Sequence, residues 1–127
     1  MWGILRALFG GSGGREVSAT EVRDRLSRGE IVLIDLREPS ETRAEAVAGA
    51  HLVPLSSFDP RALPIDPARP IVFYCATGRR SLVALARCTA AGLPDTAHMR
   101  GGLAAWKAAG LPTAPGGSRV ATQRRRR

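Results

Sequence analysis

The sequence predicts an α/β domain with a mainly parallel β-sheet, and two observations support this fold class. Short apolar segments rich in β-branched residues alternate along the chain with segments of helical spacing that end in glycine or proline. Ile31–Ile34 and Ile71–Tyr74 are continuous apolar runs, which is typical of strands covered by helices on both faces. The length of 127 residues suits one domain with one hydrophobic core.

Five short apolar segments are the predicted strands. They are Val17–Ser18, Ile31–Ile34, Leu52–Val53, Ile71–Tyr74 and Thr96–Met99. The first is short enough for an edge strand, and Pro54 ends the third. Four prolines between positions 55 and 70 leave room there for only a turn or two of helix.

Four segments carry helix signals. They are Thr20–Arg28, Ser40 to about Val47, Ser81–Ala91 and Leu103–Ala109. Ser18 and Thr20 are alternative caps of the first helix. Val22 and Leu26 lie on one face of that helix, and Gly29 ends it.

The loop between the fourth strand and the third helix carries the residues with the most obvious chemistry. Cys75 begins this loop, Gly78 lies in its middle, and Arg79 and Arg80 end it. With Ser81 as the N-cap, the free N–H groups and the dipole of the helix favour negative charge, so the thiol loses its proton more readily than a free cysteine. Gly78 allows the tight backbone bend. We therefore predict a nucleophilic thiolate in an anion-binding loop; the alternative, a buried cysteine that ends a core strand, leaves the glycine and the arginines unexplained.

Charge and cysteine content narrow the class of protein. The formal net charge is +8, but Arg119 and Arg124–Arg127 supply five of the positive charges. The rest of the chain is only mildly basic, which argues against a nucleic-acid-binding domain. Two cysteines are too few for a disulfide framework and no secretory signal is recognisable, so we expect a reducing, cytoplasmic location. No apolar run reaches the roughly 20 residues needed to span a bilayer.

The sequence divides into three parts. Residues 1–14 hold an apolar segment and a Gly-rich linker, residues 15–112 form the folded domain, and residues 113–127 are a flexible basic tail. Met1–Phe9 has two interpretations: a docking helix for a membrane surface or a partner, or a terminus that frays or packs back, which we favour. The arginines of the tail are interpreted as solvated, although an acidic partner or nucleic acid would also attract them.

Three motifs, in this order, resemble the rhodanese-like family of sulfurtransferases. They are Ile34-Asp35-Leu36-Arg37-Glu38 with Glu41, Tyr74-Cys75 with Gly78-Arg79-Arg80-Ser81, and Gly101-Gly102 with Trp106, Gly110, Leu111 and Pro112. Together they cover about residues 16–112. The resemblance implies a five-stranded, mainly parallel sheet flanked by helices on both faces and a cysteine that carries sulfur as a persulfide. The chain departs from the family pattern after Glu41, where Thr42 replaces an aromatic residue and Glu45-Ala46 replace Gly-His.

The resemblance and the loop together predict a sulfurtransferase similar to thiosulfate sulfurtransferases, with Cys75 as the catalytic residue. The Cys75 thiolate takes a sulfane sulfur from a small anionic donor such as thiosulfate, or from a persulfide, and gives it to cyanide or to a thiol, including a protein thiol. The predicted substrate-binding residues are Ala76, Thr77, Gly78, Arg79 and Arg80, and the supporting residues are Asp35, Arg37 and Ser81. No metal or organic cofactor is expected, because this reaction needs none and no ligand spacing suggests one.

Two other functions are consistent with the same loop. One is a rhodanese-like binding module without turnover, which the presence of Cys75 disfavours. The other is an oxyanion phosphatase or arsenate reductase, because an arginine-rich thiolate loop also binds oxyanions. Related phosphatases place arginine after cysteine with five residues between them, whereas Arg80 follows Cys75 with four between them and Ser81 occupies the phosphatase arginine position. The shorter loop resembles the sulfur-transfer form.

Several neighbouring residues have a structural interpretation as well as a functional one. Asp35 ends a strand in the same layer as Cys75, and a structural pair with Arg37 is favoured over a direct role in the chemistry. Cys88 lies on the helix after the loop and is interpreted as a buried residue rather than a resolving thiol. His51 and His98 show no Cys-His-carboxylate pattern.

Overall fold

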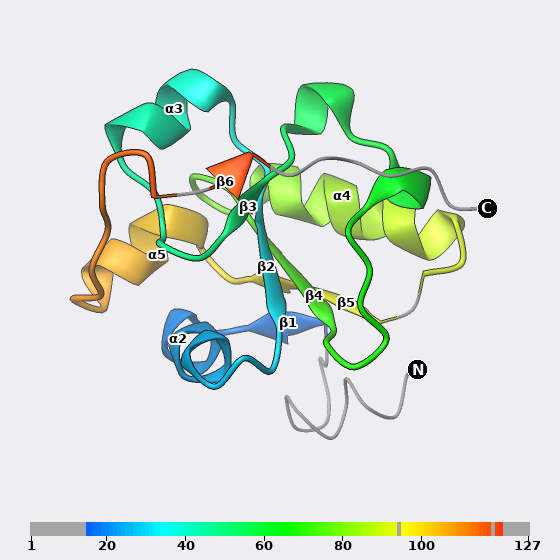
Figure 1. Ribbon diagram of the computed structural model, residues 1–127, viewed down its shortest axis with the longest axis horizontal. Coiled ribbons are helices and arrows are strands. Elements are labelled where there is room, and N and C mark those ends of the chain that lie inside the picture. Colours follow the sequence, from blue (N-terminus) through cyan, green and yellow to red (C-terminus); the bar gives the residue numbers. More distant parts are fainter. Residues whose placement is uncertain (1–14, 94, 118, 121–127) are drawn as a thin grey trace.

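The computed structural model describes residues 15–93, 95–117 and 119–120, which form a parallel β-sheet with helices on both of its faces (Figure 1). The strands are β1 (Glu16–Val17), β2 (Val32–Asp35), β3 (His51–Leu52), β4 (Ile71–Tyr74), β5 (Thr96–Met99) and β6 (Arg119–Val120). Their order in the sheet is β1-β5-β4-β2-β3-β6, and each neighbouring pair is parallel. The predicted fold class is therefore confirmed: β1 to β5 are the five predicted strands, and the two-residue β6 extends the sheet beyond β3.

The helices separate into layers on either side of the sheet. They are α2 (Ala19–Ser27), α3 (Pro39–Ala44), α4 (Arg79–Ala90) and α5 (Gly102–Ala108), with two 3-10 turns, η1 (Leu55–Ser57) and η2 (Pro60–Ala62). One face is covered by α2 and α5, and the other by α4 and the segment that contains the 3-10 turns (Figure 1). The remaining helix, α3, follows the carboxyl end of β2.

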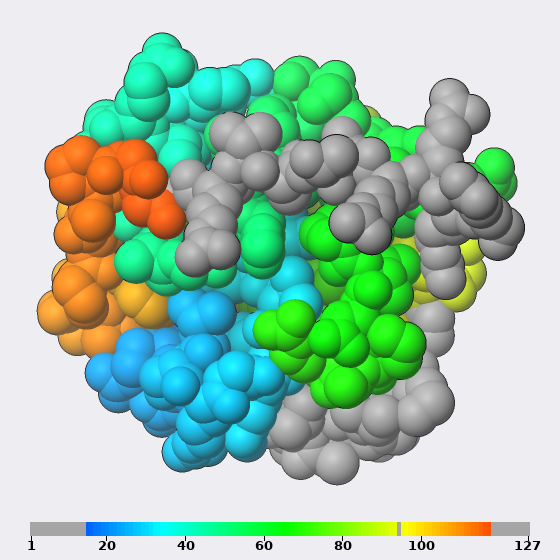
Figure 2. Space-filling model, in the orientation of Figure 1, coloured from blue at the N-terminus to red at the C-terminus, as the bar shows by residue number. Residues whose placement is uncertain are grey.

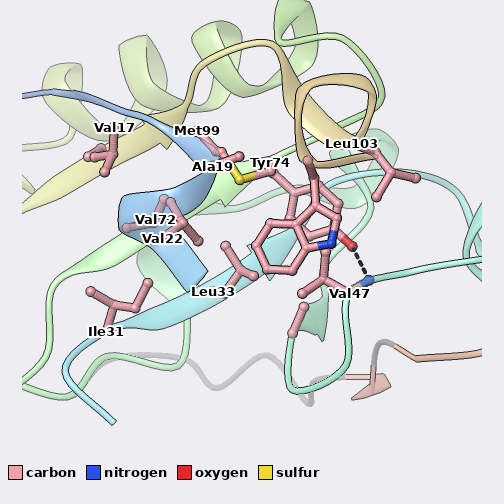
Figure 3. Packing of buried hydrophobic residues seen from close by; sticks show 13 residues of the cluster. Val17, Ala19, Val22, Ile31, Leu33, Val47, Val72, Tyr74, Met99 and Leu103 are labelled. Carbon is pink, nitrogen blue, oxygen red and sulfur yellow. Dashed lines mark hydrogen bonds between the residues drawn. The ribbon is translucent and has the colours of Figure 1, made fainter. Parts of the chain in front are cut away.

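Side chains of the central strands alternate between the two layers. Leu33 and Tyr74 point toward α2 and α5, where they join the cluster drawn in Figure 3. Ile34, Phe73 and Cys75 belong to the opposite cluster, under α4. All five are 1% exposed or less, so both faces are dry, which explains why the sequence shows continuous apolar runs instead of alternation.

Helix α4 begins earlier than the sequence suggests. Gly78 is its N-cap residue, with φ at 106°, and the helix begins at Arg79. Ser81 is therefore not the N-cap: it lies buried in the first turn, where its hydroxyl donates to the Gly78 carbonyl at 3.0 Å. The positive φ of Gly78 turns the chain directly into the helix, which a residue with a side chain does only at a cost.

Helix α3 is shorter than predicted. It spans Pro39–Ala44 rather than Ser40 to about Val47, with Pro39 in its first turn. The Glu38 amide donates to the Glu41 carboxylate at 3.0 Å, which fixes the entry to this helix. Val47 lies after the helix and is buried in the core, where its amide donates to the Tyr74 hydroxyl at 3.1 Å (Figure 3).

Residues after the predicted domain end at position 112 fold back on the domain. Ala114 and Ala46 form an antiparallel bridge, with their N–H···O distances at 2.9 and 3.0 Å. The Gly116 amide donates to the Thr42 carbonyl at 3.1 Å, so this segment, drawn in orange, lies against α3 (Figure 2). The predicted apolar segment Met1–Phe9, its linker and the arginines at 124–127 lie outside the described residues. Within the described ranges, no helix has the length and apolar character needed to cross a membrane.

Candidate active site

Cys75 lies at the carboxyl end of β4, where open parallel sheets bind their ligands. Its side chain is 1% exposed, and the Gly78 amide donates a hydrogen bond to its Sγ atom at 3.1 Å. This contact places a backbone N–H donor directly at the sulfur atom. The structure thus brings together the predicted Cys75, Gly78 and Ser81, and leaves Thr77 and Arg79 exposed at the loop surface.

The first turn of α5 contacts the backbone of the Cys75 loop through two hydrogen bonds. The Leu103 amide donates to the Cys75 carbonyl at 2.8 Å, and the Ala104 amide donates to the Ala76 carbonyl at 3.0 Å. A side chain at Gly102 would place its Cβ atom 2.5 Å from the Cys75 carbonyl oxygen, so only glycine permits this approach. The carbonyls at the start of the loop are thus engaged by α5, away from the sulfur.

Ser81 connects Cys75 to a histidine on a neighbouring strand. Its Oγ atom lies 3.9 Å from Cys75 Sγ and 3.0 Å from His98 Nδ1. The sequence shows no Cys-His-carboxylate motif for His98. The period of two along β5 is the available signal, because it places His98 on the side of the sheet that α4 covers.

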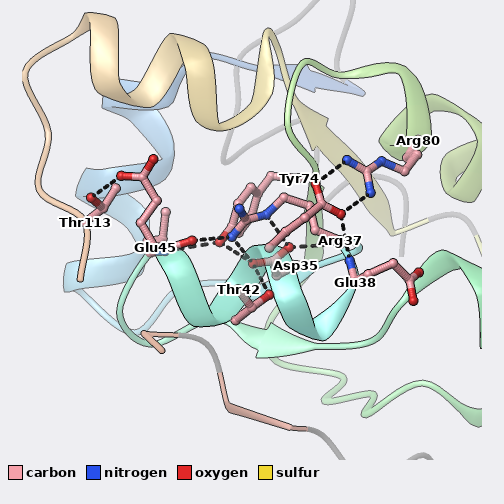
Figure 4. A network of polar contacts seen from close by, with 10 residues as sticks. Asp35, Arg37, Glu38, Thr42, Glu45, Tyr74, Arg80 and Thr113 are labelled. Atoms are coloured by element: carbon pink, nitrogen blue, oxygen red, sulfur yellow. Dashed lines mark hydrogen bonds and ion pairs between the residues drawn. The ribbon is translucent and has the colours of Figure 1, made fainter. Parts of the chain in front are cut away.

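Arg80 forms an ion pair with Glu41 of α3 (Figure 4). Two nitrogens of its guanidinium lie 2.7 and 2.9 Å from the two carboxylate oxygens. This bidentate contact lowers the pKa of Glu41 to about 2, although partial burial opposes the shift. The sequence predicts Arg80 as an anion ligand but gives no sign of Glu41 as its partner, because the two residues are 39 positions apart.

Asp35 and Arg37 form the predicted structural pair (Figure 4). The Nε and Nη2 atoms of Arg37 lie 3.0 and 2.8 Å from the Asp35 carboxylate, whose residue is fully buried. The hydroxyl of Tyr74, the residue that pairs with Asp35 in the sheet, donates to the same carboxylate at 2.6 Å. These contacts join the carboxyl ends of β2 and β4, and Cys75 directly follows the end of β4.

Cys88 lies on α4, on the face of the helix that is buried against the sheet. Burial raises the pKa of its thiol to about 12, which favours the protonated, weakly nucleophilic form at neutral pH. Across the described residues, no three histidine, cysteine or acidic side chains are grouped to hold a metal ion.

An apolar groove of about 600 Å³ lies between α2 and Trp106, and no residue of the Cys75 loop lines it.

These features define an α/β protein that presents a cysteine in a loop at the carboxyl end of a central parallel strand. The sequence profile of the rhodanese-like domain matches residues 18–109. A sulfurtransferase of Allochromatium vinosum is 33% identical over 98 residues, which are 76% of this chain and 92% of that protein. An uncharacterized protein of Synechocystis sp. is 42% identical over 83 residues, which are 65% of this chain and 46% of that protein.

A solved structure shares the fold as well. The crystal structure of thiosulfate sulfurtransferase from Pseudomonas aeruginosa matches with a TM-score of 0.74 at 29% identity, over 83% of this chain and 21% of that chain. The chain thus spans less than half of the Synechocystis protein and about a fifth of the Pseudomonas chain. The protein belongs to the rhodanese-like domain family.

The contact between the loop and α5 predicts different effects for two glycine substitutions. Gly102 and Gly110 both have positive φ, at 61° and 75°, so Gly→Ala costs about 1–2 kcal/mol at either position. Only at Gly102 does the new Cβ meet backbone atoms, so Gly102→Ala should cost a further 1–3 kcal/mol or so, as in other overpacked sites. Urea unfolding of both variants measures the difference, and equal losses would contradict the close approach.

The Glu41–Arg80 pair predicts a specific acid dependence of stability. The pKa of Glu41 is lowered from 4.5 to about 2 in the folded state, so its contribution is complete above the unfolded value and is lost as the pH falls toward 2. The contribution should be at most about 1 kcal/mol, because both side chains are partly exposed. Unfolding free energies of wild type and Glu41→Gln should therefore converge on acidification; a difference that stays constant over this range would refute the assignment.

Proposed function

We propose that the protein is a sulfurtransferase that moves a sulfane sulfur through a persulfide on Cys75. The donor is thiosulfate or another persulfide, and the acceptor is cyanide or a thiol, including a protein thiol. The main supporting observation is the hydrogen bond of 3.1 Å from the Gly78 amide to the Cys75 sulfur, in a loop too short for the phosphatase arrangement. The relative and the solved structure that are named sulfurtransferases support the same reaction.

The reaction consists of two displacements at sulfur. In the first, the Cys75 thiolate attacks the outer sulfur of thiosulfate, the S–S bond of the donor breaks, and sulfite leaves with the bonding electron pair. In the second, the acceptor attacks the outer sulfur of the persulfide, and the Cys75 thiolate leaves. The cycle returns Cys75 to its starting state, so the protein undergoes no net oxidation.

The loop supplies the stabilisation of charge in both steps. The Gly78 amide already contacts the sulfur, and the amides at positions 79–81 in the first turn of α4 have no acceptor within the helix. A persulfide whose outer sulfur extends into this region meets donors and the positive end of the helix dipole. Arg79, exposed at the start of α4, attracts an anionic donor. Arg80 offers a second guanidinium beside the loop to a donor that displaces the Glu41 carboxylate from it.

The chemistry also suggests where the protein works. Both cysteines are free, and the proposed nucleophile must remain a thiolate between turnovers. A reducing compartment maintains that state, so we place the activity in the cytoplasm. The two displacements exchange sulfur for sulfur and require neither a metal nor an organic cofactor.

The first test of this proposal is the mass of the intact protein after incubation with thiosulfate. Wild type should gain one sulfur, about 32 Da, and lose it again on addition of cyanide, as the two-step covalent route requires. Cys75→Ser should not gain this mass, because a serine hydroxyl stays protonated and forms no persulfide.

Cys88→Ser is the matched control for the loss of a thiol. It should gain the sulfur like wild type, since the Cys88 thiol is buried and protonated. Loss of the mass gain in Cys88→Ser alone would show that Cys75 is not the nucleophile. A wild-type protein that is never modified by thiosulfate or by a persulfide donor would refute the proposed function.

The second test concerns the positive charge beside the loop. Arg80→Ala should reduce kcat/KM for thiosulfate, a dianion, by about 10- to 100-fold, which corresponds to the roughly 1.5–3 kcal/mol of a charged hydrogen bond. The reduction should be smaller for an uncharged alkyl persulfide. The double variant Glu41→Gln/Arg80→Ala removes the carboxylate that would otherwise remain unpaired. Equal losses for both donors in the double variant would indicate a collapsed loop instead of an electrostatic role.

A further inference from the structure

Three side chains from three different elements form a continuous polar line that ends at the reactive sulfur. Cys75 follows β4, Ser81 lies in the first turn of α4, and His98 belongs to β5. The distances along the line are 3.9 Å from Cys75 Sγ to Ser81 Oγ and 3.0 Å from Ser81 Oγ to His98 Nδ1. All three residues are buried, so water does not compete for these contacts.

We propose that Ser81 and His98 form a proton relay that ionises Cys75. This role rests on the proposed sulfur transfer, because that reaction needs a thiolate at the start of each turnover. His98 touches neither the sulfur nor a substrate, so it is a positioning residue that acts through the Ser81 hydroxyl. The sequence offers no motif for such a role, and the juxtaposition exists only in the folded chain.

The surroundings of His98 determine which of its nitrogens is free to accept a proton. Its Nε2 atom lies 3.4 Å from Oε2 of Glu16 on β1. An ionised carboxylate can only accept hydrogen bonds, so Nε2 carries the proton and Nδ1 has a free lone pair toward Ser81. Glu16 also stabilises the imidazolium that forms when Nδ1 takes up a second proton.

The charges around His98 allow both of its protonation states. Burial lowers the pKa of His98, and Glu16 opposes this shift, so the imidazole is neutral near neutral pH. Arg100, which follows β5, disfavours the imidazolium, but its Nη1 atom lies 3.4 Å from Glu16 Oε1. Cys88, on the buried face of α4, stays neutral because burial raises the pKa of its thiol to about 12. In the resting state His98 is therefore a neutral proton acceptor, and the Glu16 carboxylate lies beside its Nε2 atom.

The transfer is balanced in atoms and charge. The Cys75 S–H bond breaks and its proton goes to Ser81 Oγ, while the original Ser81 O–H bond breaks and that proton goes to His98 Nδ1. The products are the Cys75 thiolate and the His98 imidazolium, and no electrons enter or leave. Ser81 Oγ lies 3.0 Å from both the Gly78 carbonyl oxygen and His98 Nδ1, and its one proton points to the Gly78 carbonyl in the resting state. The hydroxyl must therefore rotate toward Nδ1 before the transfer, while the Gly78 amide donates to the sulfur at 3.1 Å.

The test is the pH profile of alkylation of Cys75 by iodoacetamide, followed by intact mass in the full chain with Cys88→Ser as background. His98→Asn keeps a polar group at the position of Nδ1 but cannot take up a proton. We expect its alkylation to be about tenfold slower near neutral pH, equivalent to a midpoint about one pH unit higher, and to equal the parent at high pH, where the thiol ionises without help. A merely structural change in the loop would instead alter the rate at high pH.

Three further variants complete the test. Ser81→Ala should shift the profile in the same direction. The double variant Ser81→Ala/His98→Asn should shift it no further, because both substitutions interrupt the same proton pathway. Glu16→Gln, an exposed change that leaves the core intact, should produce a smaller shift of the same sign. His51→Asn, which removes the other histidine of the chain, should leave the profile unchanged.

The outcomes separate this proposal from the proposed function. Alkylation requires no sulfur donor, so a shifted profile in a protein that never forms a persulfide would support the relay and refute sulfur transfer. A profile of His98→Asn that coincides with the parent would overturn the relay. If His98→Asn fails to fold, Glu16→Gln decides: a profile identical to that of the parent would overturn the relay equally.

Discussion

The close approach between α5 and the Cys75 loop is the contact on which the site depends. Two amides at the start of α5 take up the carbonyls of Cys75 and Ala76, at 2.8 and 3.0 Å. Because these carbonyls are engaged on one side, the Gly78 amide can face the sulfur on the other. Gly102 makes this possible, since any Cβ at that position would collide with the loop backbone. The Gly101-Gly102 motif thus determines the shape of the loop that carries Cys75.

A buried polar network holds the strand ends that carry the loop. Asp35 accepts hydrogen bonds from Arg37 and from the Tyr74 hydroxyl, and that hydroxyl in turn accepts from the Val47 amide. Removing one partner of a buried ion pair leaves an uncompensated charge, which commonly costs several kcal/mol. Such a network tolerates little rearrangement, so it fixes the relative positions of β2 and β4 and, with them, the residue that follows Tyr74.

The sequence predicts those parts of the protein that depend on local patterns. The apolar runs identify β1 to β5 to within a residue or so but miss β6, and Cys75, Gly78 and the arginines are recognisable by spacing alone. Contacts between distant positions are not recognisable in this way: Glu41 meets Arg80, and His98 meets Ser81, only because the sheet order places their elements side by side. The start of α4 was predicted wrongly for a different reason: serine is a favoured N-cap residue, so the sequence pattern favours Ser81, whereas the N-cap is Gly78, whose positive φ is a property of the folded backbone.

The ion pair between Arg80 and Glu41 bears on product inhibition. Sulfite, inorganic phosphate and sulfate are all small oxyanions that an unpaired arginine beside a helix N-terminus would retain. In this protein both carboxylate oxygens of Glu41 already contact the guanidinium, so an incoming anion must displace a ligand that is tethered to the same chain. Tethering gives Glu41 a high effective concentration, which weakens the net affinity of every free anion. In the proposed reaction, this competition favours the release of sulfite over its retention beside Arg80.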